Sequence, residues 1–235
     1  MSVTQKCGKR TSFTIAVDGP AASGKSTVAK LVAAKLGMLY IDTGAMYRAV
    51  TLAALEALDP SLSKDNYTDE LTESFVSSLL PTLNIEFEAG TKNVLLNGKD
   101  VSKAIRNNLI SKHVSVVASY KAVRDRLVAL QREIAQGQSV IMDGRDIGTV
   151  VFPNADLKIF MIASARVRAE RRLKELRSRG DNISLDSLVK EIEERDHLDS
   201  TRKEGPLVKA KDAVELDTDE LNINQVVNKI LDLVK

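Results

Sequence analysis

Short runs of apolar residues alternate along the chain with longer segments in which apolar residues recur every three or four positions. Five short runs are typical of buried strands: residues 13–17, 38–41, 139–142, 157–162 and 213–217. Helical periodicity occupies residues 27–36, 45–58, 123–134, 165–179, 186–199 and 223–234. This alternation predicts an α/β fold, with a five-stranded parallel sheet and helices on both of its faces.

Residues 60–106 do not follow this alternation of short apolar runs and helical segments. We expect a helix over residues 69–80, ended by Pro81, and short antiparallel strands at 85–88, 94–96 and 99–101. Asn97-Gly98 is a strong signal for the tight turn of a hairpin. The stretch therefore predicts a small antiparallel β subdomain inserted into the α/β domain.

Composition narrows the class of protein. Of the 235 residues, 43% are hydrophobic, and 34 basic against 32 acidic residues leave a formal charge of +2. This balance gives no general case for a nucleic-acid or membrane partner, and no apolar run is long enough to span a bilayer. The single cysteine, Cys7, suits a reducing, cytoplasmic compartment. Residues 1–12 predict a flexible tail rather than a signal peptide. His113 and His197 are too isolated for a metal site, and we expect surface or capping roles for them.

The most informative single motif is Gly19-Pro-Ala-Ala-Ser-Gly-Lys-Ser26, which fits the phosphate-binding loop G-x-x-x-x-G-K-[ST]. A polyphosphate needs many donors at short range, and Gly19 and Gly24 allow a tight turn whose N–H groups point inward. We expect Lys25 to reach the outer phosphates and Ser26 to place its hydroxyl on Mg²⁺. The helix that follows adds the positive end of its dipole.

Two polar clusters follow other predicted strands, at the sheet edge where parallel strands bind ligands. Asp42-Thr-Gly-x-x-x-Arg48 combines an acid, a hydroxyl and an arginine that suit a small phosphorylated substrate, although a helix cap beside a surface arginine has the same pattern. Asp143-Gly-Arg-Asp146 resembles the second acidic element of phosphate-loop enzymes, which meets the Mg²⁺ site directly or through water. A structural aspartate turn is the alternative for this cluster.

Two charged segments toward the C-terminus each have two interpretations. Residues 166–179 hold seven basic side chains, which form either a solvated helix face or a mobile lid over a triphosphate. Arg195, Asp199 and Arg202 share one helix face, either as an ordinary ion-pair ladder or as contacts to a nucleotide.

Four runs together resemble the bacterial cytidylate (CMP) kinase family of nucleoside-monophosphate kinases. They are Gly19-Pro-Ala-Ala-Ser-Gly-Lys-Ser-Thr27, Asp42-Thr-Gly-Ala-Met-Tyr-Arg48, Asp143-Gly-Arg-Asp-Ile-Gly-Thr-Val-Val-Phe-Pro153, and Arg195-Asp-x-x-Asp-x-x-Arg202 followed by Pro206-Leu207. The likeness runs from about residue 13 to the C-terminus, and its third run is far more specific than the phosphate loop.

The resemblance implies ATP-dependent phosphorylation of CMP and dCMP to CDP and dCDP, with Mg²⁺, by a cytoplasmic monomer of pyrimidine metabolism. It also implies a single kinase domain over residues 13–235. The core would be 13–59, 107–164 and 205–235, the monophosphate-binding insert 60–106, and the lid about 165–204.

Roles for individual residues follow from the motifs and the resemblance. The expected catalytic residues are Lys25, Arg145, Arg168 and Arg172. The expected ATP-binding residues are Gly19, Pro20, Ala21, Ala22, Ser23, Gly24, Lys25, Ser26 and Thr27, with Ser26 as the metal ligand. The expected substrate-binding residues are Asp42, Thr43, Arg48, Ser115, Arg124, Arg145, Asp146, Arg195, Asp199 and Arg202. Among these, Ser115 and Asp146 are expected near the cytosine and Asp199 near the sugar.

Some positions depart from the family pattern. Thr43 stands where serine is common, the hydroxyl of either Ser26 or Thr27 could face Mg²⁺, and Leu198 and Ser200 replace arginines found in some members.

The main alternative is a kinase of UMP, AMP or a metabolite such as shikimate. A GTPase-like switch lacks the expected Asn-Lys-x-Asp motif, and the near-neutral charge argues against a nucleic-acid-dependent ATPase.

Overall fold

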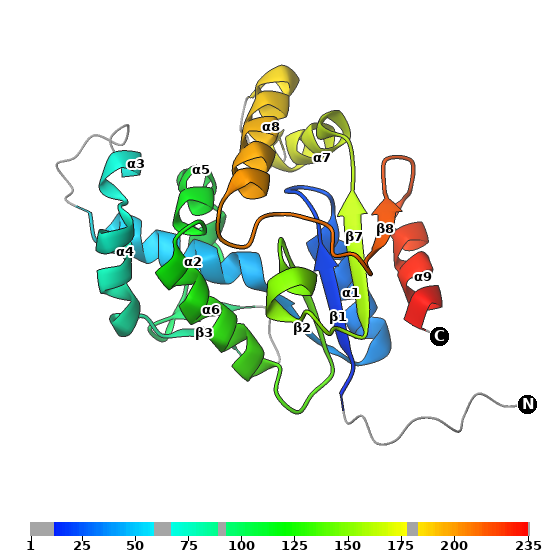
Figure 1. Cartoon of the computed structure of the whole chain (residues 1–235). Helices are drawn as coiled ribbons and strands as arrows, with labels where there is room; N and C mark the ends of the chain where they lie inside the picture. The colour runs from blue at the N-terminus through cyan, green and yellow to red at the C-terminus, as the bar shows by residue number, and fades with distance from the viewer. Residues whose placement is uncertain (1–11, 59–66, 89–92, 178–182, 235) are drawn as a thin grey trace, which may run out of the picture.

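The computed structural model describes residues 12–58, 67–88, 93–177 and 183–234. They form a parallel sheet and a smaller antiparallel sheet, with helices around both (Figure 1). The strands of the parallel sheet are β1 (Thr14–Asp18), β2 (Leu39–Asp42), β6 (Val140–Gly144), β7 (Leu157–Ile162) and β8 (Val214–Asp217). The α-helices are α1 (Lys25–Leu36), α2 (Thr43–Glu56), α3 (Tyr67–Glu70), α4 (Glu73–Leu79), α5 (Asn108–Val117), α6 (Lys121–Ile134), α7 (Ala165–Arg177), α8 (Leu185–Thr201) and α9 (Ile223–Val234).

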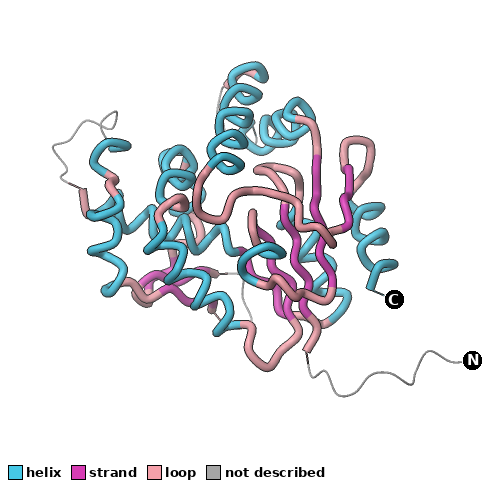
Figure 2. The backbone as a smooth tube through the Cα atoms, viewed as in Figure 1, coloured by secondary structure: helices cyan, strands magenta, loops and turns pink. Residues whose placement is uncertain are grey.

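The five-stranded sheet confirms the predicted architecture. Its strand order is β2-β6-β1-β7-β8 and every pairing is parallel. β1, β2 and β6 each run past their apolar residues into the polar ones, so that they end on Asp18, Asp42 and Gly144. Figure 2 shows these ends leading into loops on the side of the sheet that faces α7 and α8. The sheet therefore delivers its polar strand ends to one edge.

Each face of the sheet has its own apolar layer. On one face, α1 and α9 pack over residues such as Ile15, Ile141 and Ile159. On the other face, α6 and the π-helix η4 (Ile147–Val151) pack over Met142 and its neighbours. Among the described helices, all are too short or too polar to cross a membrane.

The antiparallel sheet consists of β3 (Ile85–Phe87), β4 (Val94–Leu96) and β5 (Lys99–Asp100), which confirms the predicted antiparallel strands. Asn97 and Gly98 both have positive φ, as the tight hairpin turn requires. The expected single helix over 69–80 is wrong. The chain breaks where Leu71 is fully buried, and the extended Thr72 accepts a hydrogen bond from the N–H of Phe75 and starts α4 afresh.

The chain around Pro81 and Arg106 forms short 3₁₀ turns, η2 (Leu80–Thr82) and η3 (Ala104–Arg106). Among the described residues, the inward side chains of the small sheet join those of α2, α5 and α6 in one apolar cluster. The expected insert begins at residue 60, and its residues 60–66 and 89–92 lie outside the described ranges.

α7 and α8 pack on each other through a small apolar cluster of their own, which includes Leu173, Leu176 and Ile192. The expected helix over 165–179 is confirmed as far as Arg177, and residues 178–182 lie outside the described part of the chain. α8 spans Leu185–Thr201, slightly more than expected. This pair stands over the polar edge of the parallel sheet (Figure 1).

Candidate active site

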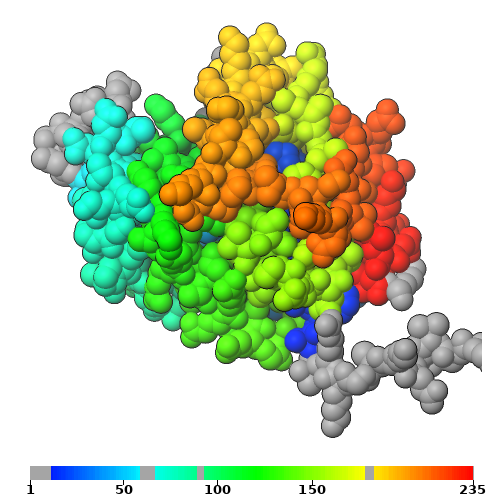
Figure 3. Space-filling view, in the orientation of Figure 1, coloured from blue at the N-terminus to red at the C-terminus, as the bar shows by residue number. Residues whose placement is uncertain are grey.

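A cleft of about 1520 Å³ opens between the sheet edge, α5 and the α7–α8 pair. In Figure 3, blue atoms of the N-terminal part lie at the bottom of an opening framed by the yellow-green and orange segments of α7, α8 and the chain that follows. A pocket for one small molecule measures roughly 300–1,000 Å³. The cleft is therefore larger than a pocket for one small molecule needs to be.

The phosphate loop connects β1 to α1 in a shape that only glycine permits at two points. Gly19 has a φ of 149°, and a Cβ there would collide with the main-chain carbonyl of Met161 on β7. Gly24 is the N-cap of α1 and adopts the left-handed conformation, with a φ of 88°. These constraints explain both glycines of the motif and confirm the expected strand–loop–helix context.

Lys25, the first residue of α1, folds back over the loop. Its Nζ donates to the carbonyl of Pro20 at 2.6 Å and to Ser23 Oγ at 3.3 Å. Burial, reinforced by the nearby Arg145, lowers the pKa of the ammonium to about 7 against the opposing effects of Asp143 and Asp18. A buried ammonium without a full counter-charge is suited to an incoming polyphosphate.

Ser26 and Asp143 lie together at the end of β6. Ser26 Oγ donates to Asp143 Oδ2 at 2.7 Å, whereas Thr27 is exposed on α1. Of the two hydroxyls that the sequence left open for Mg²⁺, Ser26 is therefore the one beside an acid. The described residues contain no group of three His, Cys, Asp or Glu side chains that could hold a metal by itself.

The Asp42–Arg48 cluster is largely occupied by structural contacts. Asp42 caps α2 by accepting from the N–H of Ala45, and Thr43 donates its hydroxyl to the carbonyl of Asp143 at 2.7 Å. Arg48 donates to the carbonyl of Ile105 and to a serine hydroxyl on α5. All three nevertheless line the cleft. The capping alternative thus describes what Asp42 does in this structure, while the cleft keeps all three beside a ligand.

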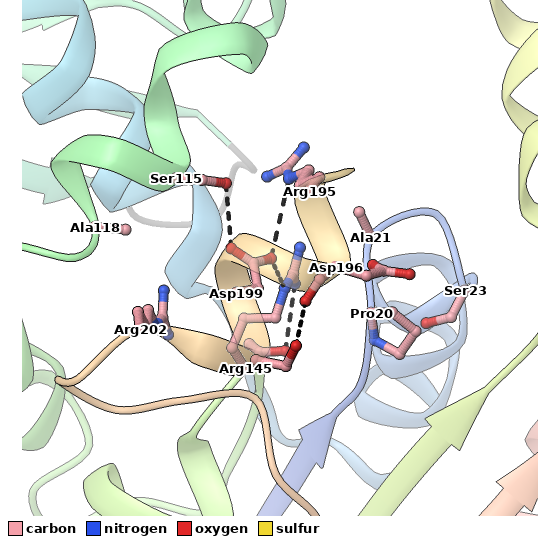
Figure 4. Close-up of polar contacts among 12 residues, drawn as sticks. Pro20, Ala21, Ser23, Ser115, Ala118, Arg145, Arg195, Asp196, Asp199 and Arg202 are labelled. Carbon is pink, nitrogen blue, oxygen red and sulfur yellow. Dashed lines mark hydrogen bonds and ion pairs between the residues drawn. The ribbon is translucent and has the colours of Figure 1, made fainter. Parts of the chain in front are cut away.

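Asp199 of α8 is the centre of a charged cluster on the opposite wall (Figure 4). Its Oδ1 accepts from Ser115 of α5 at 3.1 Å, and its Oδ2 accepts from Arg145 Nε at 2.8 Å and lies 4.0 Å from Arg195 Nε. The arginines lower the pKa of the Asp199 carboxyl despite its burial. Arg195 Nε is buried and has no hydrogen-bond partner among the described residues. This cluster therefore keeps donor capacity for an anionic or polar ligand.

Arg124 and Asp146 form a buried ion pair beside this cluster. The chain after α8 lies on the pair, because Gly205 has a φ of 55° and packs directly against both side chains. Arg202 donates twice to the carbonyl of Gly205, at 2.6 and 2.8 Å. The segment that leaves α8 is thus held against a pair that was expected to contact the acceptor nucleotide.

The two expected lid arginines differ in their surroundings. Arg168 is buried and donates to the carbonyls of Ala163 and Ala21 and to Asp196 Oδ2, so its guanidinium ties α7 and α8 to the phosphate loop. Arg172 is partly exposed, lies 3.2 Å from a glutamate one turn along α7, and lines the cleft. Only Arg172 of this pair faces the cleft directly.

The structure brings the expected site residues together around one cavity, with four exceptions. Gly19, Pro20, Arg124 and Arg168 are not among the residues that line it. Arg195, Arg202 and Arg48 all show a lowered guanidinium pKa, because burial and neighbouring arginines disfavour the charge. Such a crowd of cations is stabilised when anions bind between them.

Two functional candidates escaped the motif analysis. Asp18 ends β1 and is buried, where its carboxylate accepts from the N–H groups of Ile147 and Gly148 at 2.8 and 2.7 Å. Tyr40 of β2 donates its hydroxyl to Asp143 Oδ1 at 2.5 Å. Their only sequence signal was that Asp18 ends one strand and Tyr40 lies within another, and neither position shows which partner a side chain contacts.

The expectation of a surface or capping role for His113 is wrong. The residue is buried on α5, where its ring lies near Tyr67 and its Nδ1 lies 3.2 Å from a threonine hydroxyl on α3. Burial lowers the pKa of this imidazole, so it packs as a neutral ring. It does not line the cleft.

Comparison with known proteins agrees with the geometry. The family model described as cytidylate kinase matches residues 15–235. A cytidylate kinase of Listeria monocytogenes is 51% identical over 222 residues, which are 94% of this chain and 95% of that protein. A cytidylate kinase of Bacillus cereus is 49% identical over 224 residues, 94% of this chain and 96% of that protein.

Among solved structures, an uncharacterized protein from Eubacterium ventriosum covers 94% of this chain and 97% of its own, with a TM-score of 0.52 and 10% identity, which shows a shared fold alone. The family model spans all of the cleft residues, and each of the two relatives aligns with 94% of the chain. The chain belongs to the cytidylate kinase family.

Proposed function

We propose that the protein transfers the γ-phosphoryl group of ATP to CMP or dCMP, giving ADP and CDP or dCDP. In this proposal residues 13–235 form one kinase domain, with the core at 13–59, 107–164 and 205–235. The stretch 60–106 is the monophosphate-binding insert, and about 165–204 is the lid. The single cysteine suits the cytoplasm, where we propose that the enzyme acts as a monomer.

The observation that carries the proposal is the single cleft that joins two unlike anion sites. One wall is the phosphate loop with Lys25 and Ser26, and the other is the cluster around Asp199 with Arg145 and Arg195. A kinase must hold its donor and acceptor so that the attacking and leaving oxygens lie in line across one phosphoryl group. Two anion sites that face one cavity support such an arrangement, and relatives about 50% identical support the choice of substrate.

The residues at the end of β6 suit Mg²⁺. Ser26 and Asp143 supply a hydroxyl and a carboxylate within 2.7 Å of each other, and hard oxygen donors of this kind, completed by phosphate oxygens and water, are what Mg²⁺ prefers. In this proposal Ser26 would hold the ion, and Asp143 would support it directly or through water. When bound with ATP, Mg²⁺ would neutralise charge on the transferred phosphoryl group.

Lys25 and the arginines supply the positive charge that the protein offers to the phosphates. Lys25 exchanges its contacts with Pro20 and Ser23 for phosphate oxygens, which restores the charged form of the ammonium. Arg145 and Arg172 face the same cavity and offer donors to the developing charge. Closure of α7 and α8 excludes water from these contacts, while Arg168 keeps the lid joined to the loop at Ala21.

No general base is needed on the acceptor side. The attacking atom is an oxygen of a phosphate monoester that is already ionised at neutral pH. This agrees with the absence of a histidine from the described lining of the cleft. Arg48 and Arg195 would hold the acceptor phosphate, Asp199 the sugar, and the Arg124–Asp146 pair with Ser115 the cytosine.

The experiment that tests the proposal is a steady-state assay of purified protein with ATP, Mg²⁺ and one nucleoside monophosphate at a time. Turnover with CMP and dCMP that exceeds turnover with UMP, AMP and GMP is expected. Turnover that is highest with UMP would retain the kinase and contradict the cytosine pocket. Absence of turnover with all five substrates would overturn the proposed reaction.

A further inference from the structure

Tyr40 is a polar side chain beside the cleft that the reaction proposed above does not use. It lies on β2 and pairs in parallel register with Ile141 of β6, as Asp42 pairs with Asp143 two residues later. Side chains two residues apart on a strand share a face, so the tyrosine ring lies on the face that carries Asp143. The long phenol reaches forward along this face, and its hydroxyl donates to Asp143 Oδ1 at 2.5 Å.

Asp143 is consequently held at three separate points. Tyr40 binds Oδ1, Ser26 binds Oδ2 at 2.7 Å, and Thr43 binds the main-chain carbonyl at 2.7 Å. Asp143 is only 5% exposed, so water cannot replace a lost partner freely. The carboxylate can rotate about the bond that joins it to its side-chain Cβ, and the hydrogen bond from the tyrosine fixes this rotation so that the other oxygen faces the serine.

The tyrosine is itself held in place. Lys30 of α1 lies with its Nζ 5.2 Å from the centre of the ring, within the range of a cation–π contact. A phenol hydroxyl is a hydrogen-bond donor at neutral pH, and this one has Asp143 as its acceptor. A fixed ring with an obligate donor is suited to orient a carboxylate.

We propose that Tyr40 is a positioning residue for the metal–nucleotide site: its hydroxyl fixes Oδ1 of Asp143, so that Oδ2 stays aimed at Ser26 and at the water shell of the Mg²⁺ that accompanies the donor nucleotide. This inference rests on the proposed function. If the Ser26 hydroxyl oxygen were to bind the ion, its hydrogen bond to Asp143 would be lost, and Tyr40 would be the described side chain that still holds the carboxylate. Outer partners of this kind commonly change metal affinity by about 10- to 100-fold when they are removed.

The test compares the wild type with Tyr40→Phe, which keeps the ring and its contact with Lys30 and removes the hydroxyl alone. Calorimetric titration gives the dissociation constant of ADP in excess Mg²⁺ and in EDTA. The constant in EDTA divided by the constant in Mg²⁺ is the ratio that measures how strongly the metal and the nucleotide support each other. We expect this ratio to fall about tenfold in Tyr40→Phe. The dissociation constants of metal-free ADP and of CMP should remain those of the wild type.

Tyr120→Phe is the matched control, because it also removes one partly buried phenol hydrogen bond, but its hydroxyl donates to the carbonyl of Leu71 and not to Asp143. It should leave the ratio unchanged. Metal coupling in Tyr40→Phe equal to the wild-type value would overturn the inference. Equal weakening of ADP binding with and without Mg²⁺ would also overturn it, since Tyr40 would then support only the shape of the loop.

A double-mutant cycle tests whether Tyr40 acts through Asp143. If it does, the double variant Tyr40→Phe/Asp143→Asn should have the same ratio as Asp143→Asn alone. If the fold-changes of the two single variants multiply in the double variant, the two residues act independently and the assignment is contradicted. Failure of the proposed function has a different signature, because the wild type would then neither bind ADP more tightly with Mg²⁺ nor phosphorylate CMP.

Discussion

Replacing Asp18 with asparagine should change the pH dependence of stability. Asp18 is buried at the end of β1 and accepts from the N–H groups of Ile147 and Gly148. Burial raises its pKa from 3.8 to about 6, against the lowering effect of these hydrogen bonds, with Asp146 adding to the rise and Lys25 opposing it. The folded protein therefore holds this proton more tightly than the unfolded chain.

The sign and the size follow from proton linkage. Between pH 3.8 and about 6 the folded state binds more protons at residue 18, so the stabilisation from this group is complete below pH 3.8 and is lost as the pH rises through 6. A shift of about two units at 1.36 kcal/mol per unit corresponds to about 3 kcal/mol. Asparagine cannot titrate, and it offers one acceptor to two N–H groups, which adds a pH-independent cost of about 1–3 kcal/mol.

The assay is urea unfolding of the wild type and Asp18→Asn at several values between pH 4 and pH 7.5. Because the other titrating groups are common to both proteins, the difference in unfolding free energy isolates residue 18. The variant should be clearly less stable at pH 4 and should recover about 3 kcal/mol relative to the wild type by pH 7. A flat difference curve, or one that falls with rising pH, would refute the reasoning.

Other substitutions test separate parts of the site. Lys25→Met should lower kcat by about 10²–10³, the usual cost of one donor to the reacting group; near-normal turnover in a coupled assay would contradict the role of the lysine. Arg124→Met removes the ion-pair partner of the buried Asp146. In a denaturation assay it should lower the unfolding free energy by about 3–5 kcal/mol. In a competition assay it should reduce the preference for CMP over UMP. Gly148→Ala places a Cβ 3.1 Å from Lys158 and should cost about 1–3 kcal/mol, and a melting temperature equal to the wild-type value would show that the site is not tightly packed.

The sequence predicted those parts of the fold that local pattern controls. Apolar runs located the strands of the parallel sheet, and Asn97-Gly98 located the hairpin turn because its left-handed conformations suit few other residues. The break at Leu71 and Thr72 was missed, since a buried leucine and a threonine occur in helices as well as between them. Tertiary burial and a cap, which periodicity does not reveal, decided that boundary.

The site was predictable where a motif dictates the backbone. The phosphate loop follows from Gly19 and Gly24, whose positions no other residue can occupy without strain or collision. Tyr40 and Asp18 were not predictable, because each acts on a partner more than 100 residues away in the chain. The inward position of Arg168 depends likewise on packing between helices that the helical pattern alone does not orient.

The most direct measurement of the central claim is the selectivity constant kcat/KM for CMP and for UMP, determined with ATP and Mg²⁺ on the wild type and on Asp146→Asn. The account predicts that the wild type prefers CMP strongly and that the variant loses most of this preference while it still turns over ATP. Equal selectivity in the two proteins, or a wild type that prefers UMP, would contradict the assignment of this cleft to cytidine nucleotides.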